Sequence, residues 1–176
     1  VRVAGNNVND YTDEQLCSLV TLAPQKPLLF SGTVRSNLDY GGGTDDDKQR
    51  ALEDADAAGF VLRKSGLDTI VLQKGSNFSG GEKQRLSLAR ALLRDAPVLV
   101  LDDAASALDY VTESRVMERV LARSRDKAVI NISQRAGTVR HADKILVLDG
   151  GKVVGLGTHD QLMQSCEVYR RLNNNG

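Results

Sequence analysis

The 176-residue sequence contains no tryptophan, only two cysteines and no long apolar run. A helix that crosses a bilayer needs roughly 18 or more consecutive apolar residues, so no segment is expected to span a membrane. Cys17 and Cys166 form no CxxC pair, which favours two scattered thiols in a reducing compartment over a single disulfide. An excess charge of either sign is also missing, because 23 basic residues balance 23 acidic ones. This balance predicts neither nucleic acid nor an anionic membrane surface as a partner.

The remaining composition is that of an ordinary globular domain, with 41% apolar and 26% charged residues. The first residues, Val1–Gly5, include no start methionine and no signal peptide, and they have the β-branched pattern of a strand that ends in a turn. We therefore expect that the chain is cut from a longer protein.

Strand and helix patterns alternate along most of the sequence. Thr12 and Gln15 have capping-box spacing and predict a short helix, and an apolar run at 19–23 predicts a strand that stops at Pro24. Another helix is expected after Thr44, where three aspartates suit the helix dipole. The remaining expected helices lie at 79–94 and 110–123, with another short helix before residue 145 and two short helices at the C-terminus. The remaining expected strands lie at 98–101, 128–132 and 145–148, with a hairpin return at 152–155.

Strands that alternate with helices predict an α/β fold with a parallel sheet and right-handed crossovers. Residues 33–93 depart from this alternation, because their patterns are mostly helical. We expect residues 1–32 and 96–176 to form the α/β core, and residues 33–95 to form an inserted helical subdomain.

The four residues Ser79, Gly80, Gly81 and Glu82 mark the start of a predicted helix. Ser79 is a good N-cap, and Glu82 occupies the capping-box position. The two glycines leave backbone N–H groups uncovered, and such a helix end can bind an anion. On these residues alone, a capped helix with nothing bound is an equally good interpretation.

Two aspartates, Asp102 and Asp103, follow the apolar run at 98–101, which is typical of a central parallel strand. Asp102 would emerge at the carboxyl edge of the sheet, where α/β proteins bind ligands. A hard oxygen ligand there suits Mg²⁺, directly or through water. Capping of the next helix would explain one of these aspartates but not the pair.

Together these segments resemble the ATP-binding cassette family, and the resemblance covers the whole chain. It implies a P-loop NTPase-like parallel sheet with an inserted helical subdomain, which binds ATP and Mg²⁺. The matching motifs keep the order and spacing of the family: the Q-loop at Ala23–Gln25, the signature at Phe78–Glu82, the Walker B motif at Val98–Asp102 and the D-loop at Ser106–Asp109.

The resemblance also implies roles for individual residues. Asp102 and Gln25 would hold Mg²⁺, and Gln25 would sense the γ-phosphate and couple the site to a membrane partner. Asp109 would lie at the interface between two cassettes that pair head to tail. In such a pair, the signature residues 79–82 bind an ATP molecule that is held by the other chain.

Two further stretches are similar to exporter-type cassettes. Pro27–Leu38 resembles the stretch after the Q-loop in exporters, and Gln73–Asn77 resembles the loop before the signature, although Gln73 stands where an acidic residue is common. An exporter implies a transmembrane domain as a partner and a location at the cytoplasmic face of a membrane, with this chain itself outside the bilayer.

Two positions depart from the usual catalytic residues of the family. Asp103 stands in place of a glutamate that polarises the attacking water, and a displacement of about 1 Å can cost ~10²-fold in rate. Gln134 replaces the switch histidine; it can donate a hydrogen bond to a phosphate oxygen but cannot become cationic. Both replacements resemble the degenerate half of a heterodimeric exporter, in which one ATP site is slow. The histidines that are present, His141 and His159, are expected to be ordinary surface residues.

The phosphate-binding pattern G-x-x-x-x-G-K-[ST] of the Walker A motif is absent, and the single Gly-Lys pair, Gly151–Lys152, lacks its context. In the family this motif precedes a stretch like Val1–Val8, so we expect the N-terminal part to be missing and not mutated. Without that loop the phosphates lose their main cradle, and the chain alone is expected to be inactive.

Three functions are compatible with these motifs. The first is part of the ATPase domain of an exporter, and the second is a non-catalytic regulatory cassette that supplies its signature to a partner's ATP site. The third is a chromosome-maintenance or DNA-repair ATPase head, which the neutral charge, the exporter-like stretches and the lack of coiled-coil heptads disfavour. A ribosome-associated cassette protein would be expected to carry a basic linker, which the sequence does not contain.

Overall fold

The structure is a computed structural model in which residues 1–174 are described. The chain divides into two compact units, Val1–Ile130 and Asn131–Gly176. Among the described residues, no helix is both long enough and apolar enough to cross a membrane.

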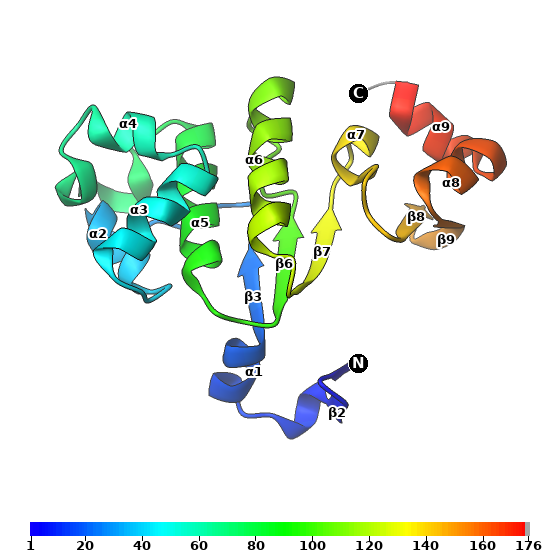
Figure 1. Ribbon diagram of the computed structural model, residues 1–176, viewed down its shortest axis with the longest axis horizontal. Coiled ribbons are helices and arrows are strands. Elements are labelled where there is room, and N and C mark those ends of the chain that lie inside the picture. The colour runs from blue at the N-terminus through cyan, green and yellow to red at the C-terminus, as the bar shows by residue number, and fades with distance from the viewer. Residues whose placement is uncertain (175–176) are drawn as a thin grey trace. The chain divides into compact units, whose positions relative to one another are not determined.

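A three-stranded sheet with the order β3–β6–β7 forms the centre of the first unit (Figure 1). β3 (Val20–Ala23) and β6 (Val98–Asp102) run parallel and in register, with Val20 beside Val98 and Ala23 beside Leu101. The unit ends within β7 (Ala128–Ile132). The predicted α/β fold with a parallel sheet is confirmed.

The core lies on one face of this sheet. Leu99 and Leu101 of β6 are each 1% exposed and share an apolar cluster with Leu88 of α5 (Gly80–Leu93) and Val116 of α6 (Tyr110–Arg123). On the other face, Leu22 is 52% exposed, and alternate residues of β6 are only partly buried. The strand order confirms the predicted central position of β6. The residues on its second face are only partly buried.

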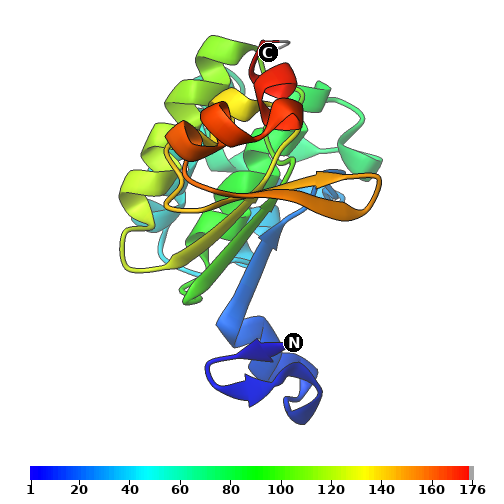
Figure 2. The same cartoon turned by 90° about the vertical axis from the view of Figure 1, so that its right-hand side faces the viewer.

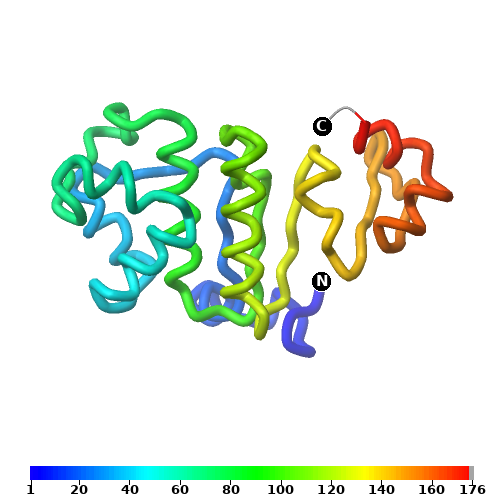
Figure 3. Tube along the Cα trace, turned by 45° about the horizontal axis from the view of Figure 1, so that its top comes forward, coloured from blue at the N-terminus to red at the C-terminus, as the bar shows by residue number. Residues whose placement is uncertain are grey.

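The segment between β3 and β6 is mainly helical and lies to one side of these strands (Figure 3). It contains α2 (Val34–Asp39), α3 (Asp45–Asp54), α4 (Ala58–Leu62) and α5. It also contains an antiparallel pair that the sequence patterns did not predict, between β4 (Gly32–Thr33) and β5 (Ile70–Val71), because strands of two residues give no periodic signal. The boundaries 33–95 of a helical subdomain stay a prediction.

Local capping signals decide where several helices begin. Thr12 precedes α1 (Asp13–Leu19), Thr44 precedes α3 and Ser79 precedes α5. In all three cases the cap and the third helical residue exchange the reciprocal hydrogen bonds of a capping box. At the N-terminus, β1 (Arg2–Val3) and β2 (Asn6–Asn7) form a small hairpin, which matches the predicted strand and turn.

Asp56, in the turn between α3 and α4, connects the helical segment to α6. Its Oδ2 accepts hydrogen bonds from Arg115 at 2.9 Å and from Arg85 of α5 at 3.3 Å, and its Oδ1 lies 3.5 Å from Arg119 Nη1. The backbone of Asp56 has φ of 55°, a left-handed conformation that aspartate tolerates better than most residues. The carboxylate of Asp56 thus forms ion pairs with three arginines, one on α5 and two on α6.

The second unit contains α7 (Ala136–Val139), the hairpin of β8 (Ile145–Asp149) with β9 (Lys152–Gly157), and two C-terminal helices, α8 (His159–Ser165) and α9 (Glu167–Asn174). The two C-terminal helices lie along one side of the hairpin (Figure 2). Gly150 and Gly151 form its turn with positive φ, as predicted from the Asp-Gly-Gly sequence.

The two histidines differ in their environment. His141 is exposed, as expected. His159 is partly buried, and its Nδ1 lies 2.9 Å from the hydroxyl of Tyr169, which is 2% exposed. The expectation of an ordinary surface residue was wrong for His159, because the contact between α8 and α9 brings the two rings together.

Candidate functional site

The carboxyl ends of β3 and β6 bring three of the predicted site residues to one edge of the sheet. Gln25 follows β3 by two residues, Asp102 is the last residue of β6 and Asp103 is the next. The parallel register makes these ends coincide, since Ala23 is paired with Leu101. As a result, Gln25 Nε2 donates a hydrogen bond of 3.1 Å to Asp103 Oδ2.

The turn after β6 fixes the position of Asp103. Its φ of 49° lies in the left-handed region, which aspartate enters more readily than longer side chains. Its carbonyl oxygen accepts hydrogen bonds from Ser106 N at 3.2 Å and from Ser106 Oγ at 2.9 Å. A constrained backbone at the end of a central strand is a common property of functional sites.

The residues at this edge fit a magnesium ion that also binds other ligands. Asp102 and Asp103 supply carboxylates, and Gln25 keeps its amide oxygen available because its nitrogen makes the bond to Asp103. Within residues 1–174, no three His, Cys, Asp or Glu side chains converge on a common metal position. Mg²⁺ commonly takes one or two carboxylates and completes its shell with water and phosphate oxygens, which suits this sparse set.

The signature segment (Phe78–Glu82) forms the beginning of α5. Ser79 Oγ accepts a hydrogen bond from Glu82 N at 3.3 Å, and Glu82 Oε2 accepts one from Ser79 N at 2.8 Å. The first N–H groups of a helix have no partner within the helix, so those of Gly80 and Gly81 are left uncovered at its electropositive end. The predicted capping box is confirmed, while the binding of an anion at this helix start stays a prediction.

The two glycines lie against the D-loop segment (Ser106–Asp109). A Cβ atom on Gly81 would stand 3.2 Å from Leu108 Cδ2 and 3.3 Å from Ala107 O, while one on Gly80 would meet only Ala107 Cβ at 3.9 Å. The absence of a side chain at position 81 thus permits close approach of the helix start to the loop.

Asp109 is the N-cap of α6. Its Oδ1 accepts a hydrogen bond from Thr112 N at 3.0 Å, and this backbone N–H lowers the pKa of the carboxyl below its usual value. The side chain is exposed and remains ionised at neutral pH. Its predicted place at an interface between two cassettes stays a prediction.

Gln134 belongs to the second unit, whereas the other predicted site residues belong to the first. It is exposed and stands between β7 and α7. The turn around it is held by Ser133 Oγ, which accepts a hydrogen bond from Arg135 N at 3.0 Å and lies 3.0 Å from Thr138 Oγ1. Its predicted catalytic role stays a prediction.

Gln84 is a residue of this region that our sequence analysis missed. It lies on α5 and is only 5% exposed, yet its side chain contacts both the Q-loop segment (Ala23–Gln25) and the D-loop segment. The sequence did contain a signal for this residue: Gln84 lies four positions before Leu88 and so on the apolar face of the predicted helix. A polar side chain on a buried face is almost always hydrogen-bonded, so partners could have been expected for it.

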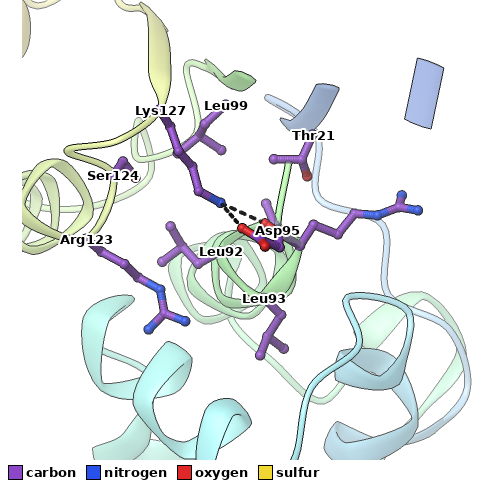
Figure 4. Close-up of a pocket in the computed structure, with 10 residues that line it drawn as sticks. Thr21, Leu92, Leu93, Asp95, Leu99, Arg123, Ser124 and Lys127 are labelled. Atoms are coloured by element: carbon purple, nitrogen blue, oxygen red, sulfur yellow. Dashed lines mark hydrogen bonds and ion pairs between the residues drawn. The ribbon is translucent and has the colours of Figure 1, made fainter. Parts of the chain in front are cut away.

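The hollow shown in Figure 4 lies away from these residues. It has a volume of about 260 Å³, and Thr21 and Leu99, which line it, are paired near the beginning of β3 and β6. Two of the three cations that line it have partners: Lys127 Nζ donates to Arg94 O at 3.0 Å and lies 3.7 Å from Asp95 Oδ1, and Arg123 is 2.7 Å from Asp54 Oδ2. The third, Arg94, is exposed. We therefore assign no ligand to this hollow.

Comparison with known proteins gives one consistent result. Residues 1–106 match the family described as ABC transporter. An uncharacterized ABC transporter ATP-binding protein of Mycobacterium tuberculosis (strain ATCC 25618 / H37Rv) is 45% identical over 174 residues, which cover 96% of this chain and 30% of that protein. An ATP-dependent lipid A-core flippase of Albidiferax ferrireducens (strain ATCC BAA-621 / DSM 15236 / T118) is 40% identical over 177 residues, which cover 98% and 30%.

A solved structure described as a bacterial Atm1-family ABC exporter with ATP bound matches the fold with a TM-score of 0.90 and 34% sequence identity. The match covers 96% of this chain and 30% of that one. The chain thus spans 30% of the length of each of these relatives.

Proposed function

The chain belongs to the ABC transporter family, and we propose that it supplies the Q-loop, signature, Walker B, D-loop and switch residues of an exporter's ATP-binding domain. That domain couples the binding and hydrolysis of ATP to transport across a membrane. The observation that carries this proposal is the meeting of Gln25, Asp102 and Asp103 at the carboxyl edge of two parallel strands. The names of the similar proteins, an exporter and a flippase, support transport as the overall function.

At this edge, Asp102 and the amide oxygen of Gln25 would hold Mg²⁺. When bound there, the ion would supply positive charge that offsets the negative charge developing on the phosphates during phosphoryl transfer. Asp103 would orient the attacking water and accept its proton, while Gln134 would donate a hydrogen bond to a phosphate oxygen. Gln25 would sense the γ-phosphate by giving up its hydrogen bond to Asp103 when the phosphate is bound.

The start of α5 would act on a second nucleotide. In a head-to-tail pair of cassettes, the uncovered N–H groups of Gly80 and Gly81 would donate to the phosphates of an ATP molecule held by the partner, with Ser79 and Glu82 fixing the helix end. Asp109 would lie at that interface. The proposal thus includes two kinds of partner, a second cassette and a transmembrane domain, and places the chain at the cytoplasmic face of a membrane.

We further propose that the ATP site at Asp102 and Asp103 is slow, so that the chain acts largely as a regulatory cassette for its partner's site. One contact favours this second role. The carboxylate of Asp103 is already engaged by Gln25 at 3.1 Å, and its side chain is one methylene shorter than the usual glutamate. Asp103 would have to break its hydrogen bond to Gln25 and would still lie farther from the attacking water than a glutamate would, and both effects slow catalysis.

The experiment uses the protein as its natural gene encodes it, purified and reconstituted in lipid. We expect Mg²⁺-dependent binding of ATP, weakened in Asp102→Asn and unchanged in Asp126→Asn, an exposed control. A natural protein that neither binds nor hydrolyses ATP in the presence of Mg²⁺ would overturn the proposal. The 176-residue chain by itself is expected to show no turnover, and turnover that Asp102→Ala abolishes would contradict that expectation.

A further inference from the structure

We infer that Gln84 is a positioning residue that links the Q-loop segment and the D-loop segment to the signature helix, so that the two loops respond to nucleotide as one body. The inference rests on the proposed function, since it concerns how the two nucleotide contacts of this chain communicate. Gln84 would touch neither nucleotide itself. Its effect would pass through the backbone of residues that do.

Both ends of the Gln84 side-chain amide are used. Its Nε2 donates to Ser106 Oγ at 3.1 Å and approaches Gln25 O at 3.4 Å, and its Oε1 accepts from Ala107 N at 2.8 Å. Two of these partners are backbone groups. The side chain therefore fixes the course of both loops, whatever side chains the loops carry.

The link extends to the acidic edge through one more residue. Ser106 Oγ, which accepts from Gln84, donates in turn to Asp103 O at 2.9 Å. Gln84 is 5% exposed, so water cannot readily replace these bonds, and a buried amide that loses its partners is costly. A continuous chain of hydrogen bonds thus connects α5 to the backbone of Asp103.

The same turn of α5 also carries the signature glycines. Gly81 lies three residues before Gln84, and a Cβ atom there would stand 3.3 Å from Ala107 O. The helix start therefore lies close to the carbonyl of Ala107, while Gln84, one turn later on the same helix, binds the N–H of Ala107. A displacement of Gly80 and Gly81 by a partner's ATP would be transmitted through Gln84 to Ala107 and Gln25.

Hydrogen–deuterium exchange of the natural protein, read by mass spectrometry, tests this directly. Ala107 is exposed, so protection of its N–H depends on the bond to Gln84. In Gln84→Met, which has a similar shape and no amide, we expect Ala107 N–H to exchange roughly fivefold to tenfold faster. Ser87→Ala is the matched control, because Ser87 is a buried residue of the same helix whose Oγ has no partner among the described residues.

A second variant separates positioning from a general loss of stability. Gln84→Glu keeps an oxygen acceptor for Ala107 N but loses the amide N–H₂ that faces Gln25 and Ser106. We expect faster exchange in the peptide that contains Gln25, with Ala107 still protected. If Gln84→Met fails to fold, Gln84→Glu alone tests the inference. Equal loss of protection in the Q-loop and D-loop segments of Gln84→Glu would overturn it. Fast exchange of Ala107 N–H in the unaltered protein would overturn it outright.

Addition of ATP and Mg²⁺ tests the coupling. In the unaltered protein both loop peptides should become protected together, and in Gln84→Met the Q-loop response should persist while the D-loop response is lost. A joint response in Gln84→Met would contradict the inference. No response in the unaltered protein would instead contradict the proposed function, because the exchange pattern without nucleotide tests Gln84 independently.

Discussion

Gln25 and Asp103 lie 78 positions apart in the sequence and are joined by a hydrogen bond of 3.1 Å between Gln25 Nε2 and Asp103 Oδ2. The bond engages both the carboxylate of Asp103, which we propose as the base, and the side chain of Gln25, which we propose to sense the γ-phosphate. Catalysis at this site would require both residues to exchange the bond for contacts to water and phosphate. In this structure, the hydrogen-bonding groups of these two side chains thus partly satisfy each other.

Restoring the residues that are usual in the family should speed this site. In the natural protein, Asp103→Glu combined with Gln134→His should raise ATP turnover by at least roughly tenfold, because a better-placed base and a group that can be cationic are both regained. Glutamate at a φ of 49° should cost about 1 kcal/mol of stability, seen as a lower unfolding temperature. Asp126→Glu, at an exposed position, is the control, and an unchanged rate in the double variant would count against a slow site.

Substitution of the two signature glycines should have unequal effects. In Gly81→Ala the new methyl would press on Leu108 and Ala107 O, so we expect a loss of about 1 kcal/mol relative to Gly80→Ala, whose methyl has room. Thermal unfolding of the two variants measures the difference. Equal unfolding temperatures would show that the loop yields without cost.

Removal of the charge of Asp56 should weaken the connection between the helical segment and α6. Asp56→Asn keeps a side chain that tolerates the left-handed backbone, yet it loses the charge that three arginines face. We expect a loss of about 1–2 kcal/mol in urea unfolding, smaller at high salt. Asp95→Asn removes a fully exposed carboxylate that lies 3.7 Å from Lys127 and should change stability far less. A similar loss in both variants would contradict this expectation.

The cap of α6 should make stability depend on pH in the acid range. The pKa of Asp109 is lowered by the N–H of Thr112, so its contribution to folding is complete above the usual carboxyl value of 3.8 and is lost as the pH falls below that value. Asp109→Asn should keep the cap and lose less stability than the unaltered protein on acidification. Parallel loss in the two proteins, measured by unfolding at a series of pH values, would argue against this role.

Local signals in the sequence predicted much of the fold. The caps at Thr12 and Ser79, the apolar run of β6 and the Gly-Gly turn before β9 act over a few residues, and each produced the expected element. The environment of His159 and the pair β4–β5 could not be read in this way, because they depend on contacts between segments and leave no periodic pattern.

The sequence indicated which residues lie at this edge of the sheet but not the contacts between them. Motif spacing selected Gln25, Asp102 and Asp103 as candidates, and the parallel register explains why they lie together, while their catalytic and metal-binding roles stay predictions. The bond between Gln25 and Asp103, and the three bonds of Gln84, depend on side-chain directions that only the packed structure defines.

The pairing of β3 with β6 also has a consequence for the order of folding. These neighbouring strands are separated by the whole helical segment, whose contacts are mostly shorter in range. Ribosomes add roughly 5–20 residues per second, so β3 is synthesised seconds before its partner strand. The edge that carries Gln25 and Asp103 is therefore completed late, and until then the nascent chain carries an unpaired apolar strand that chaperones would be expected to shield.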